Sequence, residues 1–487
     1  MQTNEETLDP GNWKGMEKLG LQMVEDMMQY LSTVRERKVW QAPPEEVKKY
    51  FSSPAPSEGG SIENIYADFK SNILPYPTGN IHPRFWGWVM GNGSPLAMLA
   101  DMLASGINMN QGGGNQAGNL VEMQVIEWFK TLFGFPAGAG GLLVSGGSMA
   151  NLVGLTVARY AHAGFDLRKE GIYGSKKRMM VYASKEVHNC VNKSIDLLGL
   201  GSDSLRLIEV NDDYEININS LRQQITDDRA SGMQPFCVIA NAVTVNTGAC
   251  DDINALADLC AQEKLWLHVD GAIGAMLGLS DKYKHLVTGM ERADSVAFDL
   301  HKWMYIPYDA GCVLVRNKEK HYKAFSLQAV YLKHEERGLA AGDTWFSDYG
   351  IELSRGFKAL KIWMSLKEHG YKKFGRMVAQ NIEQVQYLKS LVLANPALEL
   401  TAPAPLNILC FRYMGKQSDE EKLNRLNNEL LLRLHESGVA LPTYTTLHGK
   451  YSLRVANTNH RTVQKDFDIL IDKVMELGKE LEKEYAL

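Results

Sequence analysis

Between residues 141 and 315 the chain alternates short apolar segments with longer amphipathic ones, and this alternation limits the folds open to it. We expect strands at 141–144, 179–183, 205–210, 236–242, 265–269, 296–300 and 312–315, with helical segments separating the first five or so. Such a pattern favours an α/β fold with a mainly parallel sheet, covered by helices on both faces. Ligands of these sheets bind beside the carboxyl ends of the strands, so polar residues just past the apolar segments are candidates for a site.

Composition excludes several classes of function. The 487 residues are 45% hydrophobic and 22% charged, which is typical of a globular protein with two or three structural units. A net charge of −5 gives no reason to expect a nucleic acid or an anionic membrane as partner. No apolar segment follows Met1 and no run of about 18 apolar residues occurs, so we expect no secretion signal, no membrane span and, by default, a cytoplasmic location. The six cysteines form no CxxC pair, which predicts reduced core residues and neither a metal site nor a disulfide framework.

The segment Ser295–Trp303, SVAFDLHKW, places a lysine where a core strand ends. A lysine fixed there loses water, and we expect Lys302 to have a lowered pKa, as an amine that forms Schiff bases requires. A lysine at a strand end is more often a surface residue with a buried stem, so this segment alone does not establish a site.

A carboxylate ends the apolar segment before it. In LWLHVDGA, at 265–272, Asp270 is followed by Gly271 and Ala272, which leave room for a flat ring. An aspartate that stays charged in a dry site needs a cationic partner, and a protonated pyridine nitrogen is one.

The segment LLVSGGSMANLVGL, at 142–155, reads as a strand, a glycine turn and a helix. Glycines let the backbone approach an anion, the helix N-terminus offers free N–H groups, and the Ser148 hydroxyl adds a donor. A Gly/Ser turn that only caps a helix is the commoner structure, so the phosphate site is one of two readings.

These three segments, with YASKEVHNC at 182–190 and AVYLKHE at 329–335, resemble the group II amino-acid decarboxylases in the order of their motifs. That family includes the aromatic-L-amino-acid, histidine and glutamate decarboxylases, and the resemblance, closest to bacterial tryptophan- or aromatic-type enzymes, runs from about Gly11 to the C-terminal helix. It implies the fold-type I architecture of pyridoxal-phosphate enzymes, pyridoxal 5′-phosphate as cofactor and an amino acid as substrate.

The resemblance also implies roles for individual residues. Lys302 would bind the cofactor covalently, Asp270 would keep the ring nitrogen protonated, and His188 would cover the ring and orient the substrate carboxylate. Tyr331 would donate the proton to Cα, and because aldehyde synthases typically carry Phe there, Tyr331 favours simple decarboxylation. The implied cofactor-binding residues are Gly147, Ser148, His188, Asp270, Asp299, His301 and Lys302.

The expected substrate residues are less specific. His82 begins the segment HPRF, which is similar to the family's pattern at the substrate entrance, and Phe85, Trp86 and Trp88 either line an aromatic pocket or pack in a core. Arg454, in YSLRVAN, corresponds to an arginine that helps to hold the substrate carboxylate in glutamate-type relatives, or else forms a salt bridge on an edge strand.

Two positions depart from the family pattern near the cofactor ring. Val245 stands where relatives usually carry the second threonine of a pair, and Ile273 stands where aromatic-type relatives often carry Tyr. We therefore expect an aromatic L-amino acid as substrate, and keep open glutamate, histidine or cysteine sulfinate. Oxidative formation of an aldehyde, an aminotransferase and an inactive cofactor-binding relative are further alternatives.

The chain divides into three expected units. Residues 1–78 form a helical dimerisation arm that includes an amphipathic helix at 12–36; residues 79–370 form the large cofactor-binding domain; residues 371–487 form a small α+β domain. The resemblance implies a homodimer with shared active sites and a loop, within 326–346, that closes over the site and carries Tyr331.

Overall fold

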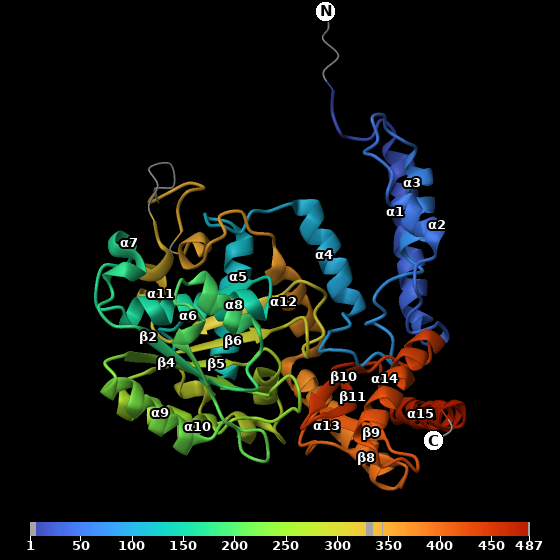
Figure 1. Cartoon of the computed structure of the whole chain (residues 1–487). Coiled ribbons are helices and arrows are strands. Elements are labelled where there is room, and N and C mark those ends of the chain that lie inside the picture. The colour runs from blue at the N-terminus through green and yellow to red at the C-terminus, as the bar shows by residue number, and fades with distance from the viewer. Residues whose placement is uncertain (1–5, 328–334, 343, 486–487) are drawn as a thin grey trace, which may run out of the picture.

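The computed structural model describes residues 6–327, 335–342 and 344–485. A seven-stranded sheet with the strand order β1-β7-β6-β5-β4-β2-β3 lies at the centre of the larger part of the molecule (Figure 1). Its strands are β1 (Gly140–Val144), β2 (Met179–Ser184), β3 (Leu205–Ile208), β4 (Gln234–Asn241), β5 (Trp266–Asp270), β6 (Ser295–Asp299) and β7 (Gly311–Val315). Neighbouring strands run parallel except for β7, which is antiparallel to both β1 and β6. The predicted α/β fold with a mainly parallel sheet is confirmed, and each expected strand is present.

Helices cover both faces of this sheet because its central strands are buried on both sides. In Figure 1, α6 and α8 lie above the sheet and α9 and α10 below it. The helices of this part are α4 (Pro95–Ile107), α5 (Ala117–Leu132), α6 (Gly147–His162), α7 (Leu167–Glu170), α8 (Cys190–Leu197), α9 (Ile218–Ala230), α10 (Ile253–Glu263), α11 (Lys318–Phe325) and α12 (Lys358–His369). Short helical turns connect them at η3 (Gly171–Gly174), η4 (Ser202–Ser204), η5 (Gly274–Leu279), η6 (Lys284–Val287), η7 (Met290–Arg292) and η9 (Phe346–Tyr349).

A smaller antiparallel sheet with the order β10-β11-β9-β8 forms a second unit with its own apolar core. Its strands are β8 (Leu398–Leu400), β9 (Ile408–Tyr413), β10 (Thr443–Leu447) and β11 (Lys450–Ala456), and its helices are α13 (Tyr371–Leu393), α14 (Glu420–Ser437) and α15 (Gln464–Glu484). The segment around Trp86 also packs here, since the Trp86 ring stacks on Phe467 with centroids 4.7 Å apart.

The N-terminal helices form an arm that stands away from the large sheet (Figure 1). The arm contains α1 (Trp13–Ser32), η1 (Val34–Glu36), α2 (Glu45–Tyr50), α3 (Ile62–Asp68) and η2 (Phe69–Ile73). Not one residue of α1 is buried, although its sequence is amphipathic. Trp13 and Leu21 are 66% and 64% exposed, so part of the apolar face of α1 is left in contact with solvent in the described part of the chain.

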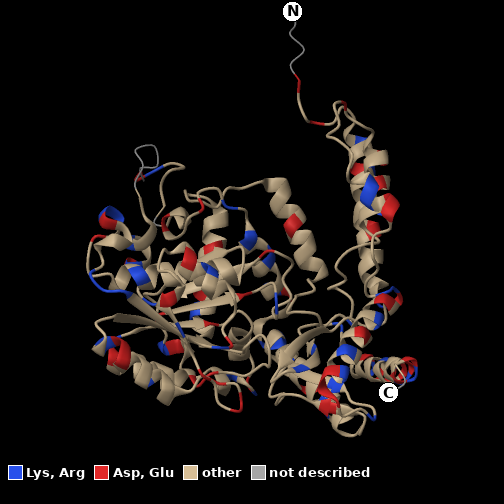
Figure 2. Ribbon diagram, in the orientation of Figure 1, with Lys and Arg blue, Asp and Glu red and all other residues tan. Residues whose placement is uncertain are grey.

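Charged residues of both signs are interspersed along the arm and the outer helices (Figure 2). Within the described residues, no helix combines the length and the apolarity needed to cross a bilayer.

Candidate active site

The carboxyl ends of β1, β5 and β6 meet at one edge of the large sheet. β1 and β6 are each antiparallel to β7 and therefore run in the same direction, and β5 is parallel to β6. The chain leaves β1 at Ser145, β5 ends with Asp270, and β6 ends with Asp299, three residues before Lys302. Two adjoining cavities open at this edge, with volumes of about 300 and 700 Å³, and His188, Ala272 and Lys302 line both.

Asp299 connects the lysine to the glycine turn. The Lys302 Nζ lies 2.7 Å from Asp299 Oδ2, and the Gly147 N–H donates a hydrogen bond to Asp299 Oδ1. Burial by itself lowers the pKa of Lys302, but the charge of Asp299 and this close contact more than offset it and raise the pKa above its ordinary value. The expected lowered pKa is therefore wrong for the free amine, because the sequence did not reveal that the carboxylate three residues earlier faces it.

Asp270 is buried and accepts a hydrogen bond from the Ala272 N–H at 3.1 Å. Burial raises the pKa of Asp270, while this hydrogen bond and the charges of Lys302 and His188 lower it in part. A carboxylate of this kind is stabilised in its charged form by a cation placed beside it, and a protonated pyridine nitrogen meets that need.

The turn before α6 fits a phosphate group. Ser145, Gly146, Gly147 and Ser148 line the 300 Å³ cavity at the helix N-terminus, where backbone N–H groups and the helix dipole favour an anion. A Cβ atom at Gly147 would lie 2.7 Å from Asp299 Oδ2, so no larger residue fits between the turn and that carboxylate. The residues present therefore fit pyridoxal phosphate at both its phosphate and its ring nitrogen.

Two histidines flank the lysine. His188 follows β2 and is open to the cavities; its Nδ1 accepts a hydrogen bond from the Cys190 N–H at 3.2 Å, and desolvation by the surrounding protein lowers its pKa. His301 is buried, accepts from the Ala310 N–H at 3.1 Å, and has a pKa that burial lowers. In each ring Nδ1 accepts a hydrogen bond, so Nε2 carries the proton of the neutral form.

The 700 Å³ cavity lies between the large sheet and the smaller unit. Trp88 lines it and is 57% exposed, with a left-handed backbone (φ 49°). The Trp88 N–H donates to Thr443 Oγ1 at 3.3 Å, and its carbonyl accepts from Arg454 Nη1 at 2.9 Å, so both of its backbone groups are fixed. Val245 and Ile273, the two departures from the family pattern, also line this cavity.

The structure corrects the expected aromatic pocket. Trp86 has no exposed surface and packs in the core of the smaller unit, where its Nε1 donates to Thr462 Oγ1 at 3.2 Å. Phe85 is buried in a small cluster with Val39 and Leu441. In an extended segment these two residues, two positions apart, would face the same way, but the chain turns at Trp88, whose left-handed backbone (φ 49°) ends that alternation.

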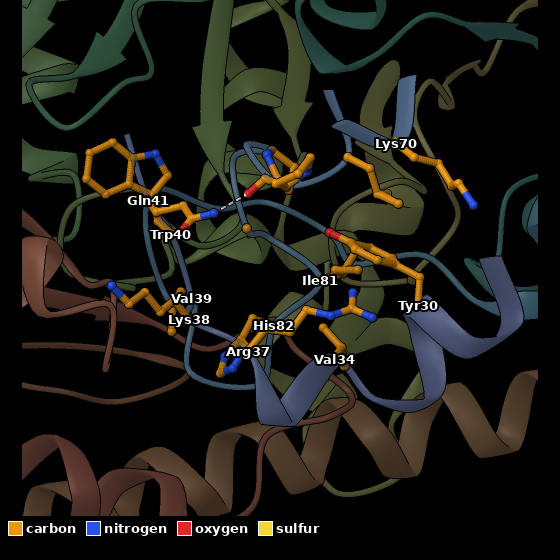
Figure 3. Close-up of a pocket in the computed structure, with 14 residues that line it drawn as sticks. Tyr30, Val34, Arg37, Lys38, Val39, Trp40, Gln41, Lys70, Ile81 and His82 are labelled. Atoms are coloured by element: carbon orange, nitrogen blue, oxygen red, sulfur yellow. Dashed lines mark hydrogen bonds between the residues drawn. The ribbon is translucent and has the colours of Figure 1, made fainter. Parts of the chain in front are cut away.

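His82 lines a different cavity of about 520 Å³, at the base of the arm (Figure 3). Figure 3 shows Tyr30, Arg37 and Lys70 around the same space. The His82 Nδ1 accepts from the Arg84 N–H at 3.0 Å, and burial lowers its pKa to about 4. The structure thus does not bring His82 together with Lys302, and this cavity has none of the expected cofactor residues.

Arg454 crosslinks three segments of the wall. Its donors reach the carbonyls of Asn246 (3.1 Å), Trp88 (2.9 Å) and Val245, and the Thr443 hydroxyl. β11 lies between β10 and β9, so Arg454 is not on an edge strand, and no carboxylate within the described residues forms a salt bridge with it. Burial lowers the pKa of this guanidinium to about 10.

Several residues that line the larger cavity were not found from the sequence. Residues of α14, β10 and β11 line the larger cavity although they are more than a hundred positions from Lys302, and no local pattern marks them: Asn428, Leu431, Leu432, His435, Thr443, Tyr444, Thr445, Thr446 and Tyr451. Tyr331, the expected proton donor, lies outside the described residues.

In the described part of the chain, no group of three or more His, Cys, Asp or Glu side chains is arranged to bind a metal.

Comparisons with known proteins agree with this geometry. A family model, the pyridoxal-dependent decarboxylase conserved domain, matches residues 44–414. The chain is 34% identical over 477 residues to an aromatic-L-amino-acid decarboxylase of Bacillus atrophaeus, which covers 96% of this chain and 97% of that protein. It is 30% identical over 470 residues to a histidine decarboxylase of Drosophila melanogaster, across 93% of this chain and 54% of that protein. The crystal structure of Oryza sativa TDC with PLP and tryptamine has the same fold, with a TM-score of 0.90, 24% identity and coverage of 98% and 100%.

Proposed function

This chain belongs to the pyridoxal-dependent decarboxylase family, and from that premise we propose that it converts an aromatic L-amino acid to the corresponding amine and carbon dioxide. Pyridoxal phosphate is its cofactor and amino-acid decarboxylation its reaction. The observation that carries the proposed substrate class is Trp88, whose exposed indole lines the same cavity as Lys302.

When bound, the cofactor supplies a conjugated ring that accepts the electron pair left at Cα. Lys302 would bind its aldehyde carbon, Asp270 would hold the proton on the ring nitrogen, and the Gly147–Ser148 turn would hold the phosphate. Asp299 keeps Lys302 and the turn together, since it contacts both.

His188 orients the substrate carboxylate and excludes water from one side of the ring, because it stands between the two cavities. Since Nδ1 already accepts from the Cys190 N–H, Nε2 is the ring nitrogen that can donate to a substrate carboxylate. In this proposal Tyr331 delivers a proton to Cα after carbon dioxide leaves; that role comes from the resemblance of its motif.

The charges of the cavity wall favour an aromatic over an acidic side chain. Among the described residues that line the larger cavity, Lys302 is the lysine and Arg454 the arginine. Lys302 is committed to the cofactor, and the donors of Arg454 already bond to three carbonyls and a hydroxyl. A substrate carboxylate on the side chain would therefore be desolvated with no lysine or arginine left to pair with it among the described residues of the wall, whereas an apolar ring packs on Trp88, Val245 and Ile273.

Histidine is the second candidate substrate, and Glu186 is the observation that favours it. Glu186 lines the same cavity, where its Oε2 accepts from Asn246 Nδ2 at 3.0 Å. The other carboxylate oxygen is a ready acceptor for an imidazole N–H of a substrate.

We also propose that the chain acts as a homodimer with shared sites and that 79–370 and 371–487 are its large and small domains. The support for a second copy is the exposed apolar face of α1, which leaves Trp13 and Leu21 in water in the single chain. Light scattering on the purified protein should give twice the chain mass of 54.4 kDa, and Leu21→Asp should shift it towards the monomer.

The test of the reaction and substrate is product analysis by mass spectrometry. The purified protein with pyridoxal phosphate would be given single L-amino acids in air, and carbon dioxide, amine, aldehyde and peroxide would be quantified. The proposal expects amine with equimolar carbon dioxide from Trp, Tyr or Phe. Amine from histidine alone would favour the second candidate, and aldehyde with peroxide would overturn simple decarboxylation.

A further inference from the structure

A buried chain of hydrogen bonds runs through the large sheet behind the candidate site. Trp266 Nε1 donates to Ser295 Oγ (2.8 Å), Ser295 Oγ contacts His268 Nδ1 (2.7 Å), and His268 Nε2 contacts Asn151 Oδ1 (2.8 Å). Asn151 Nδ2 then donates to the Gly147 carbonyl at 2.8 Å. Trp266, Ser295, His268 and Asn151 are all buried, and none but Asn151 lines either cavity of the site.

The direction of each bond in this chain follows from chemistry. An amide oxygen only accepts, so His268 Nε2 carries the proton and donates to Asn151. His268 Nδ1 is then an acceptor, and Ser295 donates to it while accepting from Trp266. Burial lowers the pKa of His268 to about 3, so the ring stays neutral and both of its nitrogens are paired at working pH.

This chain of bonds spans the two ends of the cofactor site. His268 lies on β5, two residues before Asp270, and Asn151 lies in the first turns of α6, four residues after Gly147. The helix lies directly on the imidazole, since a Cβ at Gly154 would be 2.6 Å from His268 Cε1. The position of the ring therefore sets how far the glycine turn stands from the Asp270 carboxylate.

We propose that His268 is a positioning residue that fixes the Gly147–Ser148 turn relative to Asp270 and so sets the affinity for the phosphate group of the cofactor. The inference rests on the proposed placement of the phosphate at this turn. Losing the Nε2 donor leaves Asn151 Oδ1 unpaired in a dry interior, which releases the amide that holds the Gly147 carbonyl.

The test compares two ligands that differ only in the phosphate. Dissociation constants of the full chain for pyridoxal phosphate and for pyridoxal would be measured by absorbance or fluorescence titration. We expect His268→Phe, which keeps a ring but loses both hydrogen bonds, to weaken pyridoxal phosphate binding by about tenfold and pyridoxal binding by less than about twofold. His268→Gln, whose amide can still donate to Asn151, should restore most of the loss.

The matched control is Tyr182→Phe, which removes another buried hydrogen bond of the same sheet, from Tyr182 to Asp228 at 2.9 Å, away from both cavities. Tyr182→Phe should leave the dissociation constant for pyridoxal phosphate, divided by that for pyridoxal, at its wild-type value. If His268→Phe does not fold, Ser295→Ala, which removes only the hydrogen bond to His268 Nδ1, should weaken pyridoxal phosphate binding relative to pyridoxal binding by a smaller factor.

If His268→Phe weakened the binding of both ligands equally, or of neither, the inference would be overturned and His268 would have a role in folding alone. A wild-type protein that binds pyridoxal as tightly as pyridoxal phosphate would overturn the phosphate placement itself. Both dissociation constants are measured without substrate, so this test remains valid even if the proposed aromatic substrate is wrong.

Discussion

The Lys302 ammonium lies 2.7 Å from the Asp299 carboxylate, and the same carboxylate accepts the Gly147 N–H. One buried acid thus connects the nucleophilic amine to the turn proposed for the phosphate. Because Asp299 raises the pKa of Lys302, the free amine is protonated at neutral pH and must give up a proton when it attacks the cofactor.

Replacement of that amine should abolish cofactor chemistry. We expect Lys302→Ala to lose the visible absorption band of the bound cofactor and at least about a thousandfold in activity, since Lys302 is the one lysine among the described residues that line the two cavities. The absorption spectrum and product assay check this. Lys193→Ala, on the exposed part of α8, is the control and should keep both; an unchanged band in Lys302→Ala would refute the assignment.

The motif around Tyr331 predicts the fate of Cα after carbon dioxide leaves. Tyr331→Phe should lower the amine yield about tenfold or more and raise aldehyde and peroxide, because the proton donor is lost. Oxygen uptake measured alongside amine release separates the two products. Unchanged amine production would show that another group donates the proton.

Trp88 should decide selectivity for the substrate side chain. Trp88→Ala removes the exposed indole from the cavity, and we expect kcat/KM for an aromatic substrate to fall about 10- to 100-fold. Trp88→Phe should recover much of it. Tyr173→Ala, at a residue that is 95% exposed outside the site, serves as the control; an equal effect of both alanine variants would contradict the role of Trp88.

Arg454 should contribute to the stability of the fold. Arg454→Met leaves the carbonyls of Trp88, Val245 and Asn246 without their donor, and we expect the free energy of unfolding to drop by about 2–4 kcal/mol. Urea unfolding measures this. Arg425→Met, an exposed arginine on α14, should change it by less than about 0.5 kcal/mol.

Buried histidines should make the protein sensitive to acid. Burial lowers the pKa of His321 to about 4, below its unfolded value of 6.5, so the unfolded chain takes up the proton first as pH falls. Stability from this group is present above pH 6.5 and is lost between about pH 6.5 and 4. Between these pH values, His321→Gln should reduce the dependence of the free energy of unfolding on pH by about 1.4 kcal/mol per pH unit, as measured by urea unfolding. His285→Gln, at an exposed position, should leave this dependence unchanged.

Much of the architecture was predictable because its signals are local. Apolar runs such as 265–269 and 296–300 must be buried whatever the rest of the chain does, and their alternation with helices leaves few alternatives to a parallel sheet. Asp270 and Lys302 could be selected because each follows such a run directly, where strand ends meet.

The sequence alone determined the family, the cofactor and the side of the sheet that carries the site. Only the tertiary structure decided that Trp88 faces the cavity while Trp86 lies in a core, that Arg454 bonds to backbone carbonyls, and that Asp299 pairs with Lys302. The physical reason is that these outcomes depend on contacts between segments far apart in the chain. The direction of a side chain at such a contact follows from packing and hydrogen bonding across the whole fold, which no local pattern records.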